Sequence, residues 1–212
     1  MFDGAFFKTP NVIQNLFPSF LWKINTSEKL IYPTFDDGPI PELTQQILNI
    51  LDQFDAKATF FCVGDNVRKH PDIFLSILRE GHAVGNHTFN HLKAWKTGHD
   101  DFLNNVLLCQ REIEKHIDQE RKLFRFPYGQ INFKVARELK RKGFRLIMWD
   151  VLSKDYNISL PAEKILMKSI QFSENGSIIV FHDNFKAKDK ILQFLPLYLK
   201  HFSDIGYKFK KL

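Results

Sequence analysis

Apolar and polar positions along the chain form blocks that predict strands and helices in turn. Nearly continuous apolar runs such as residues 58–63 are typical of buried strands, whereas residues 41–54 carry apolar side chains at the helical spacing of three and four. The predicted strands are 29–35, 58–63, 82–86, 123–126, 144–149, 177–181 and 207–212. The predicted helices are 41–54, 67–80, 101–119, 132–142, 161–173 and 188–202, with a helical piece at 11–20 before them.

About seven strands therefore alternate with about six helices, an order that indicates a mostly parallel sheet covered by helices. Seven such units fit either a closed barrel or an open doubly wound sheet, and the pattern alone does not choose between them. No repeat, low-complexity tract or change of composition divides the chain, so we expect one domain over residues 29–212. Residues 1–28 are expected to form a helical extension that packs on this domain.

The net charge of +6 and the pI of about 9.2 raise the question of a nucleic-acid partner. The densest basic runs, 140–142 and 208–211, lie near predicted element ends, where Lys and Arg suit a helix C-terminus or remain solvated. No nucleic-acid motif accompanies them, so we expect no nucleic-acid partner. The charge suits attraction to a polyanionic surface such as a cell wall.

No continuous apolar run in the sequence reaches the length of a signal peptide or of a membrane span. From the chain as written we therefore expect a soluble protein in the cytoplasm, with export by a non-standard route left open. The aromatic N-terminal segment is expected to pack on the domain, and contact of this segment with a membrane surface is the less favoured alternative.

Unusual polar clusters follow the predicted strands, each just past the C-terminal end of its strand. In β/α folds this edge carries the active site, in barrels and open sheets alike, so we expect the clusters to meet there. In chain order the clusters are Asp36 with Asp37, His87 with His91, Arg125 to Tyr128, Asp150 with Asp155, and His182.

Two imidazoles and a carboxylate in these clusters form a candidate metal site. His87 and His91 are four residues apart and are expected on one side of a helical turn. With one carboxylate they make a two-His, one-carboxylate set that leaves coordination positions open, as a catalytic metal requires. A lone His pair at this spacing is more often surface or core, but the Asp-Asp-Gly-Pro turn at 36–39 favours ligands.

Asp36 and Asp37 would repel each other unless a cation or an arginine separated their roles. Arg125 suits this task, because a guanidinium paired with a carboxylate keeps it ionised; its simpler interpretation is a strand-end arginine. His182, at the same edge, is interpreted as an acid–base group in preference to a capping histidine.

Together these motifs resemble the polysaccharide deacetylase family, also called the NodB homology domain or carbohydrate esterase family 4. The match runs from Thr34-Phe-Asp-Asp-Gly-Pro39 through His87-Thr-Phe-Asn-His91 and Arg125-Phe-Pro-Tyr128 to Asp155-Tyr156 and His182, and it covers about residues 29 to 185. The resemblance implies a single-domain, distorted (β/α)7 barrel. It also implies a divalent metal, commonly zinc, with cobalt, nickel or manganese as other options.

The family resemblance further implies the role of each site residue. The metal ligands would be Asp37, His87 and His91, and the catalytic base would be Asp36, tethered by Arg125. His182 would be the general acid, held and tuned by Asp155, and the main-chain N–H of Tyr128 would help to hold the oxyanion. Substrate contacts would come from Tyr156, Val180 and Pro127.

The implied reaction is hydrolysis of an N-acetyl group on an amino sugar or an N-acetylated polysaccharide resembling peptidoglycan or chitin. The chain departs from the family pattern at Leu152, where an aspartate is usual, at Tyr156, where a tryptophan is usual, and at Val180, where a leucine is usual. These departures affect the shape of an acetyl-sized apolar pocket, and so the identity of the substrate.

Three other functions are weighed against this one. The first is hydrolysis of a different non-peptide C–N amide bond, in a small amide or ureide, on the same scaffold. The second is a non-catalytic carbohydrate-binding relative, which is less favoured because every catalytic role is filled. The third is a non-haem iron oxygenase, which also uses two histidines and one carboxylate but would leave the second acid, the arginine and the distal histidine without a purpose.

Overall fold

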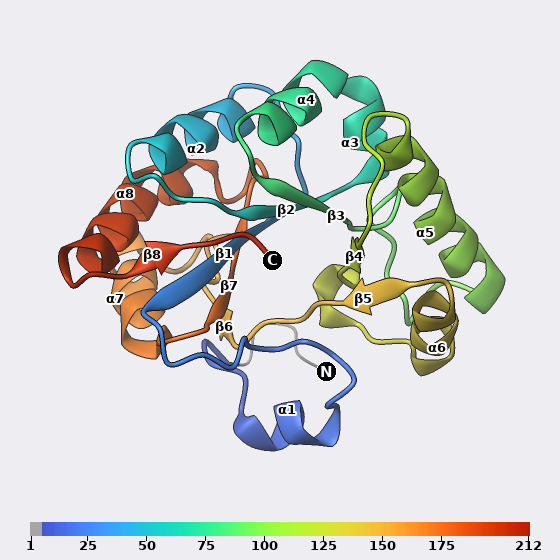
Figure 1. The fold of residues 1–212 in the computed structure, drawn as a ribbon, viewed down its shortest axis with the longest axis horizontal. Helices are drawn as coiled ribbons and strands as arrows, with labels where there is room; N and C mark the ends of the chain where they lie inside the picture. The colour runs from blue at the N-terminus through green and yellow to red at the C-terminus, as the bar shows by residue number, and fades with distance from the viewer. Residues whose placement is uncertain (1–5) are drawn as a thin grey trace.

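The computed structural model describes residues 6–212, in which strands and helices alternate along the chain (Figure 1). The strands are β1 (Leu30–Asp36), β2 (Thr59–Cys62), β3 (Ala83–Asn86), β4 (Lys122–Phe124), β5 (Phe144–Leu146), β6 (Val151–Leu152), β7 (Ile178–His182) and β8 (Lys208–Phe209). The helices are α1 (Asn11–Leu16), α2 (Leu43–Asp52), α3 (Gly64–Lys69), α4 (Pro71–Arg79), α5 (His99–Glu114), the 3₁₀ helix η1 (Pro127–Gly129), α6 (Phe133–Arg141), α7 (Ala162–Phe172) and α8 (Lys188–Asp204).

The strands form one curled parallel sheet in the order β5-β4-β3-β2-β1-β7-β6, and β8 pairs with the first residues of β1. Helices surround the sheet on its outer side (Figure 1). The two outermost strands of this order, β5 and β6, are consecutive in the chain and are separated only by residues 147–150. The expected α/β fold, a distorted barrel in a single domain, is confirmed.

The strand predicted over 144–149 is two strands, because the chain changes its neighbour in the middle. Ile147 N–H still donates to Phe124 O of β4 (2.8 Å), but Asp150 N–H donates to Ile178 O of β7 (3.2 Å). Asp150 therefore precedes β6 instead of following a strand. Its carboxylate accepts a hydrogen bond from Ser177, the residue before β7, so the prediction that Asp150 lies at the C-terminal edge is wrong.

The helix predicted over 67–80 is also two elements, α3 and α4, with a break at His70. Proline disfavours the helical conformation in the residue before it, and His70 has φ −130° and ψ 56°. Pro71 then occupies the first turn of α4, where its missing N–H costs nothing. The same effect ends α1 early, because Phe17 precedes Pro18 and leaves the helical region with φ −128° and ψ 62°.

Residues 7–24, which we call the strap, run along the segment between β5 and β6, and α1 within the strap lies between α6 and α7 at the bottom of Figure 1. Leu21 N–H donates to Leu146 O (2.9 Å), and Met148 N–H donates to Leu21 O (2.8 Å). Farther along, Leu152 N–H donates to Phe7 O (2.8 Å). The strap thereby pairs the backbone edges that the sheet leaves open here. The first five residues of the predicted extension lie outside the described residues.

A buried ion pair fastens the strap to the barrel. Lys8 Nζ lies 2.9 Å from Asp150 Oδ2 and 2.8 Å from Glu174 Oε1, and the Asp150 side chain is fully buried. Burial raises the pKa of Asp150, and the charge of Lys8 opposes this rise. A second pair, between Lys23 and Glu174 (2.8 Å), is more exposed to solvent.

Phenylalanine fills much of the core. The Phe35 ring centroid lies 5.0 Å from that of Phe60 and 5.5 Å from that of Phe181, in a cluster that extends beneath α2, α4 and α8. A second cluster, which includes Phe20 and Phe124, extends beneath α5, α6 and the strap. None of the helices in residues 6–212 combines the length and the apolar character that a membrane crossing needs.

We expect Lys8→Met to lower the free energy of unfolding at pH 7 by about 3 kcal/mol, because it leaves the buried Asp150 carboxylate without its cation. Lys23→Met is the matched control: it removes a more exposed ion pair on the same strap and should cost less than about 1 kcal/mol. Urea denaturation of the two variants and the wild type measures both values. Equal losses in the two variants would contradict the assignment of Lys8 as the main anchor.

Candidate active site

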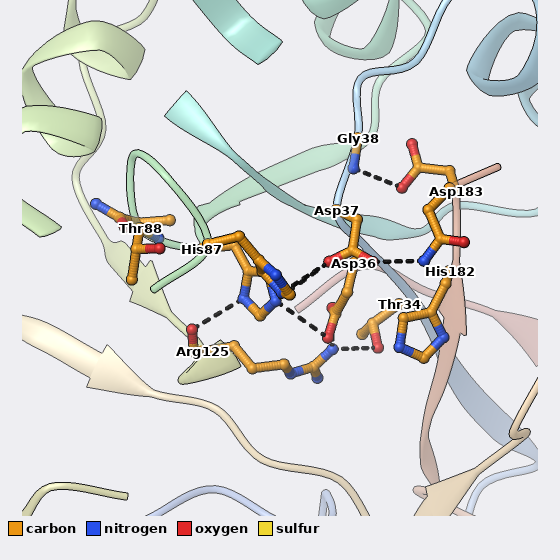
Figure 2. Close-up of polar contacts among 12 residues, drawn as sticks. Thr34, Asp36, Asp37, Gly38, His87, Thr88, Arg125, His182 and Asp183 are labelled. Carbon is orange, nitrogen blue, oxygen red and sulfur yellow. Dashed lines mark hydrogen bonds and ion pairs between the residues drawn. The ribbon is translucent and has the colours of Figure 1, made fainter. Parts of the chain in front are cut away.

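A cavity of about 410 Å³ opens at the C-terminal ends of the strands. It is the place where the predicted polar clusters meet, and Figure 2 shows side chains from β1, β7 and the loop after β3 pointing toward one another. The cavity is lined by Asp36, Asp37, His87, His91, Phe126, Tyr128, Trp149, Leu152, Tyr156, Val180, His182, Asn184, Phe185 and Lys186.

The two neighbouring carboxylates face different partners because the backbone turns sharply between them. Asp36 is the last residue of β1, whereas Asp37 adopts a left-handed conformation with φ 91°. This conformation is costly for a non-glycine residue. Asn66 Nδ2 supports it by donating to Asp37 O (2.8 Å).

Gly38 lets the turn approach the end of β7. Gly38 N–H donates to Asp183 Oδ1 (2.9 Å), and Thr44 Oγ1 lies 2.8 Å from the other oxygen of this carboxyl group. A Cβ atom on residue 38 would lie 1.8 Å from Asp183 Oδ2, so only glycine fits. Burial raises the pKa of Asp183 to about 8.

His87 and His91 lie on an irregular loop, and the prediction of a helical turn is wrong. Thr88 and His91 have φ 64° and φ 54°, which no helical turn contains. A side-chain amide in α5 holds the loop, since Asn105 Oδ1 accepts from the main-chain N–H groups of residues 89 and 90 (2.8 and 3.0 Å). The spacing of four nevertheless brings the two imidazole rings together, with centroids 5.0 Å apart.

Asp37, His87 and His91 form a cluster whose ligand atoms all lie within 4.8 Å of one another, the only such group found among residues 6–212. His87 Nδ1 donates to Arg125 O (2.9 Å), which leaves Nε2 as the acceptor that faces the cluster. Burial lowers the pKa of His87 to about 4, so its imidazole is neutral at pH 7, as a ligand must be.

The unsatisfied oxygen of Asp37 indicates that this cluster fits a cation. Asp37 Oδ2 accepts from Asn184 Nδ2 (2.6 Å), while the buried Oδ1 accepts no hydrogen bond from any described residue. Oδ1 instead lies 3.0 Å from His91 Nε2 and 3.6 Å from His87 Nε2. Burial opposes ionisation of Asp37, but its interactions with His91, with smaller contributions from His182 and His87, outweigh burial and hold its pKa well below the usual range. One carboxylate and two imidazoles converge on a single point, which suits a divalent cation.

Asp36 is held from the other side by Arg125, whose side chain is 0% exposed. Arg125 Nη1 lies 2.7 Å from Asp36 Oδ1 and donates to Thr34 Oγ1 (2.8 Å), and Nη2 donates to Met148 O (3.0 Å). The guanidinium carbon lies 4.1 Å from the centroid of the Phe61 ring. The second Asp36 oxygen remains beside the cluster, 3.9 Å from His87 Nε2.

His182 and Asp155 form a second ion pair across the cavity. His182 Nδ1 lies 2.7 Å from Asp155 Oδ1, and the His182 main-chain N–H donates to Asp155 Oδ2 (2.8 Å). Burial acts to lower the pKa of His182, but the charge and hydrogen bond of Asp155 prevail and raise it to about 9. His182 Nε2 is the ring atom left to face the cavity.

The remaining predicted residues lie in different positions relative to the cavity. Tyr128, with φ 58°, lines it, and its ring centroid lies 4.6 Å from that of His91. Tyr156 and Val180 also line it, and so does Leu152, at the position where the family usually has an aspartate. Pro127 is buried in η1 and is not part of the cavity wall.

Several cavity residues were not predicted from the sequence. Asn184, which binds Asp37, follows His182 by two residues, and its place just past a strand end was the available signal. Phe126 lies within the predicted cluster Arg125 to Tyr128 but had no role of its own, and Trp149 gave no signal, because an aromatic side chain in an apolar run is indistinguishable from core. Phe185 and Lys186 stand at the mouth of the cavity on an irregular segment that no periodicity describes.

Comparisons with known proteins agree with this geometry. A family model described as polysaccharide deacetylase matches residues 23–147. The chain is 34% identical over 189 residues to a peptidoglycan-N-acetylglucosamine deacetylase of Bacillus cereus, which covers 89% of this chain and 88% of that protein. It is 31% identical over 163 residues to a chitooligosaccharide deacetylase of Azorhizobium caulinodans, with 76% and 77% covered.

The structure is similar over nearly its whole length to a crystal structure of the Bc1960 peptidoglycan N-acetylglucosamine deacetylase. The TM-score is 0.88 at 27% identity, with 96% of this chain and 95% of that chain covered. Other relatives are longer: the chain spans 54% of a second Bacillus cereus deacetylase and 38% of the Bacillus subtilis peptidoglycan-N-acetylmuramic acid deacetylase PdaC.

We expect Asp155→Asn to lower the pKa of His182 well below about 9, because it removes the largest of the contributions that oppose burial and leaves only the smaller ones of Asp37 and Asp36. The folded-state pKa is raised, so the ion pair stabilises the wild type fully below about pH 6.5, and this contribution is lost as the pH rises through about 9. NMR titration of the imidazole in cation-free protein measures both pKa values. An unchanged pKa in the variant would show that Asp155 does not set it.

Proposed function

This chain belongs to the polysaccharide deacetylase family, and from that premise we propose that it removes the N-acetyl group from an amino sugar in an N-acetylated glycan. The family is metal-dependent, and the convergence of Asp37, His87 and His91 around an unsatisfied carboxylate oxygen is the observation that carries the proposal. Asp36 lies on one side of this point and His182 on the other, and amide hydrolysis requires such a base and acid.

Asp37, His87 and His91 would hold the divalent cation, and two imidazoles with one carboxylate favour zinc among the options. A bound cation would supply Lewis acidity, which polarises a carbonyl oxygen and lowers the pKa of a water molecule. The three protein ligands leave coordination positions open toward the cavity, where the acetyl group would enter. Asn184 orients the Asp37 carboxylate by its hydrogen bond to Oδ2.

Asp36 is the proposed catalytic base, which takes a proton from the attacking water. Its Oδ1 is occupied by Arg125, so the other oxygen, near His87 Nε2, is the one directed at the reacting water. Arg125 fixes the carboxylate in this orientation and stabilises its charge in a buried environment. Asp36 therefore pairs with Arg125 and acts on the water, whereas Asp37 would bind the cation.

His182 is the proposed general acid, which donates a proton from Nε2 to the departing amine. An amine is a poor leaving group, so its departure requires protonation. Asp155 binds Nδ1 and so fixes the ring with Nε2 toward the cavity. It also favours the protonated ring, which is the form that can donate.

The developing oxyanion needs a hydrogen-bond donor, whereas the acetyl methyl group needs an apolar surface. The main-chain N–H of Tyr128 is the proposed oxyanion donor, supported by the left-handed turn that places this residue at the cavity wall. The methyl group would contact the apolar wall formed by Leu152, Tyr156 and Val180. Because Leu152 replaces an acid, this wall is more apolar than the family pattern implies.

Aromatic side chains at the mouth favour a glycan over a small amide as the substrate. Phe185 is 74% exposed and Tyr128 is 36% exposed, and both line the cavity. An exposed aromatic face provides an apolar surface for the C–H face of a sugar ring. A small amide at the cation would lie near Tyr128, whose ring centroid is 4.6 Å from that of His91, and would gain less from the more exposed Phe185 ring.

We expect the protein to release acetate from N-acetylglucosamine oligomers, and a chelator to abolish the release. His87→Ala should lose both the bound cation and the activity, whereas Asp36→Asn should retain the cation and lose activity by at least about a hundredfold, the scale of a missing base. Acetate assays and bound-metal analysis measure these effects. The proposal fails if Asp36→Asn keeps wild-type acetate release, or if small amides alone are hydrolysed.

We expect Phe185→Ala to raise KM for the oligomers about tenfold, equivalent to about 1.4 kcal/mol, and to leave kcat largely unchanged, because the ring contacts the sugar outside the reacting centre. Met167→Ala, which trims an exposed apolar side chain on α7 away from the cavity, is the matched control and should have no effect. Steady-state kinetics with oligomers of increasing length give both constants. An equal KM in the two variants would remove Phe185 from the substrate-binding surface.

A further inference from the structure

We propose that the strap takes part in catalysis: Thr9 and Leu21 are positioning residues that hold the Met148 carbonyl in place, and through it Arg125 and the base Asp36. This proposal rests on the proposed function, in which Asp36 is the base. The strap is distant in the sequence from Asp37, His87 and His91. According to this proposal it nevertheless helps to orient the carboxylate that accepts a proton from the reacting water.

The backbone between β5 and β6 needs a partner because the sheet does not supply one. After residue 147 the chain leaves β4, and it reaches β7 only at residue 150. The strap bonds the stretch between: Leu21 N–H donates to Leu146 O (2.9 Å), Met148 N–H donates to Leu21 O (2.8 Å), and Thr9 Oγ1 donates to Trp149 O (2.9 Å). Buried backbone groups that lose such partners carry a full desolvation penalty.

The Met148 carbonyl in this stretch is one of the groups that orient Arg125. Arg125 Nη2 donates to Met148 O (3.0 Å), while Nη1 bonds Thr34 and Asp36. The guanidinium is planar, so its two Nη atoms move together. A displaced Met148 carbonyl therefore rotates the Nη1 that holds Asp36 Oδ1, and the free oxygen of Asp36 turns away from the reacting water.

Mutation of Thr9 best distinguishes a role of the strap in positioning Arg125 from a role in holding the strap on the barrel. It is buried, and its hydroxyl reaches the carbonyl next to Met148. That carbonyl belongs to Trp149, which lines the cavity, with its ring centroid 5.7 Å from the Arg125 guanidinium carbon. The strap anchor at Lys23, by contrast, forms its ion pair with Glu174, which lies outside residues 146–150.

The test compares Thr9→Val, which keeps the shape and removes the hydroxyl, with Thr9→Ser, which restores it. We expect Thr9→Val to lower kcat about tenfold, since small displacements of catalytic groups have large effects on rate, with KM and the affinity for zinc unchanged. Thr9→Ser should recover most of the wild-type kcat. Lys23→Met should keep wild-type kcat although it weakens the strap. Thr9→Ala removes the same hydroxyl and replaces the valine variant if that does not fold.

A double-mutant cycle tests the route through the arginine. In an Arg125→Lys background, which lacks the Nη2 contact with Met148, Thr9→Val should cause no further loss of kcat. The proposal is overturned if folded Thr9→Val retains wild-type kcat, if its loss persists undiminished in the Arg125→Lys background, or if Lys23→Met lowers kcat equally.

A readout besides turnover separates this proposal from the proposed function. NMR exchange of the Arg125 guanidinium protons reports how firmly the side chain is held, and Thr9→Val should accelerate it while Lys23→Met should not. A wild-type protein that releases no acetate overturns the proposed function. Unchanged guanidinium exchange in Thr9→Val overturns the positioning by the strap, whatever the activity.

Discussion

The separation of two adjacent carboxylates is the constraint on which the site depends. Two such charges about 4 Å apart repel by about 4 kcal/mol at an effective dielectric constant near 20, so each needs its own cation. The left-handed backbone at Asp37 sends its carboxylate toward two imidazoles, while Asp36 faces the guanidinium of Arg125. A right-handed backbone at Asp37 would change the direction of its side chain, and the two carboxylates would no longer face separate partners.

The Arg125 guanidinium that pairs with Asp36 is buried, so the separation of the two carboxylates also depends on the fold around this arginine. A buried cation is costly unless its charge and its donors have partners. The partners of Arg125 Nη1 and Nη2 come from β1 and from the bent segment between β5 and β6, whereas its Nε has none among the described residues. That segment bends because it leaves β4 to join β7, and the strap pairs the backbone that the bend exposes. The distortion of the barrel and the orientation of the base thus have a common origin.

The sequence predicted what depends on local periodicity and on chain order: the alternation of strands and helices, and the edge at which the polar residues gather. It was wrong where long-range pairing decides. Asp150 was placed at the C-terminal edge because an apolar run does not reveal that a strand changes neighbours. The loop of His87 and His91 was taken for a helical turn, because its left-handed residues are supported by Asn105, far along the chain.

Cation binding and the proton on His182 are coupled by the same carboxylates. The pKa of His182 is raised by Asp155 and, to a lesser degree, by the charges of Asp37 and Asp36. A cation held by Asp37 would cancel part of this negative charge and so would lower the pKa of the imidazole below about 9. An acid whose pKa lies near the working pH is both protonated and able to give up its proton. In the proposed mechanism, the cation that would activate the water would therefore also lower the pKa of the proposed acid, and Asp155 raises that pKa in the cation-free protein.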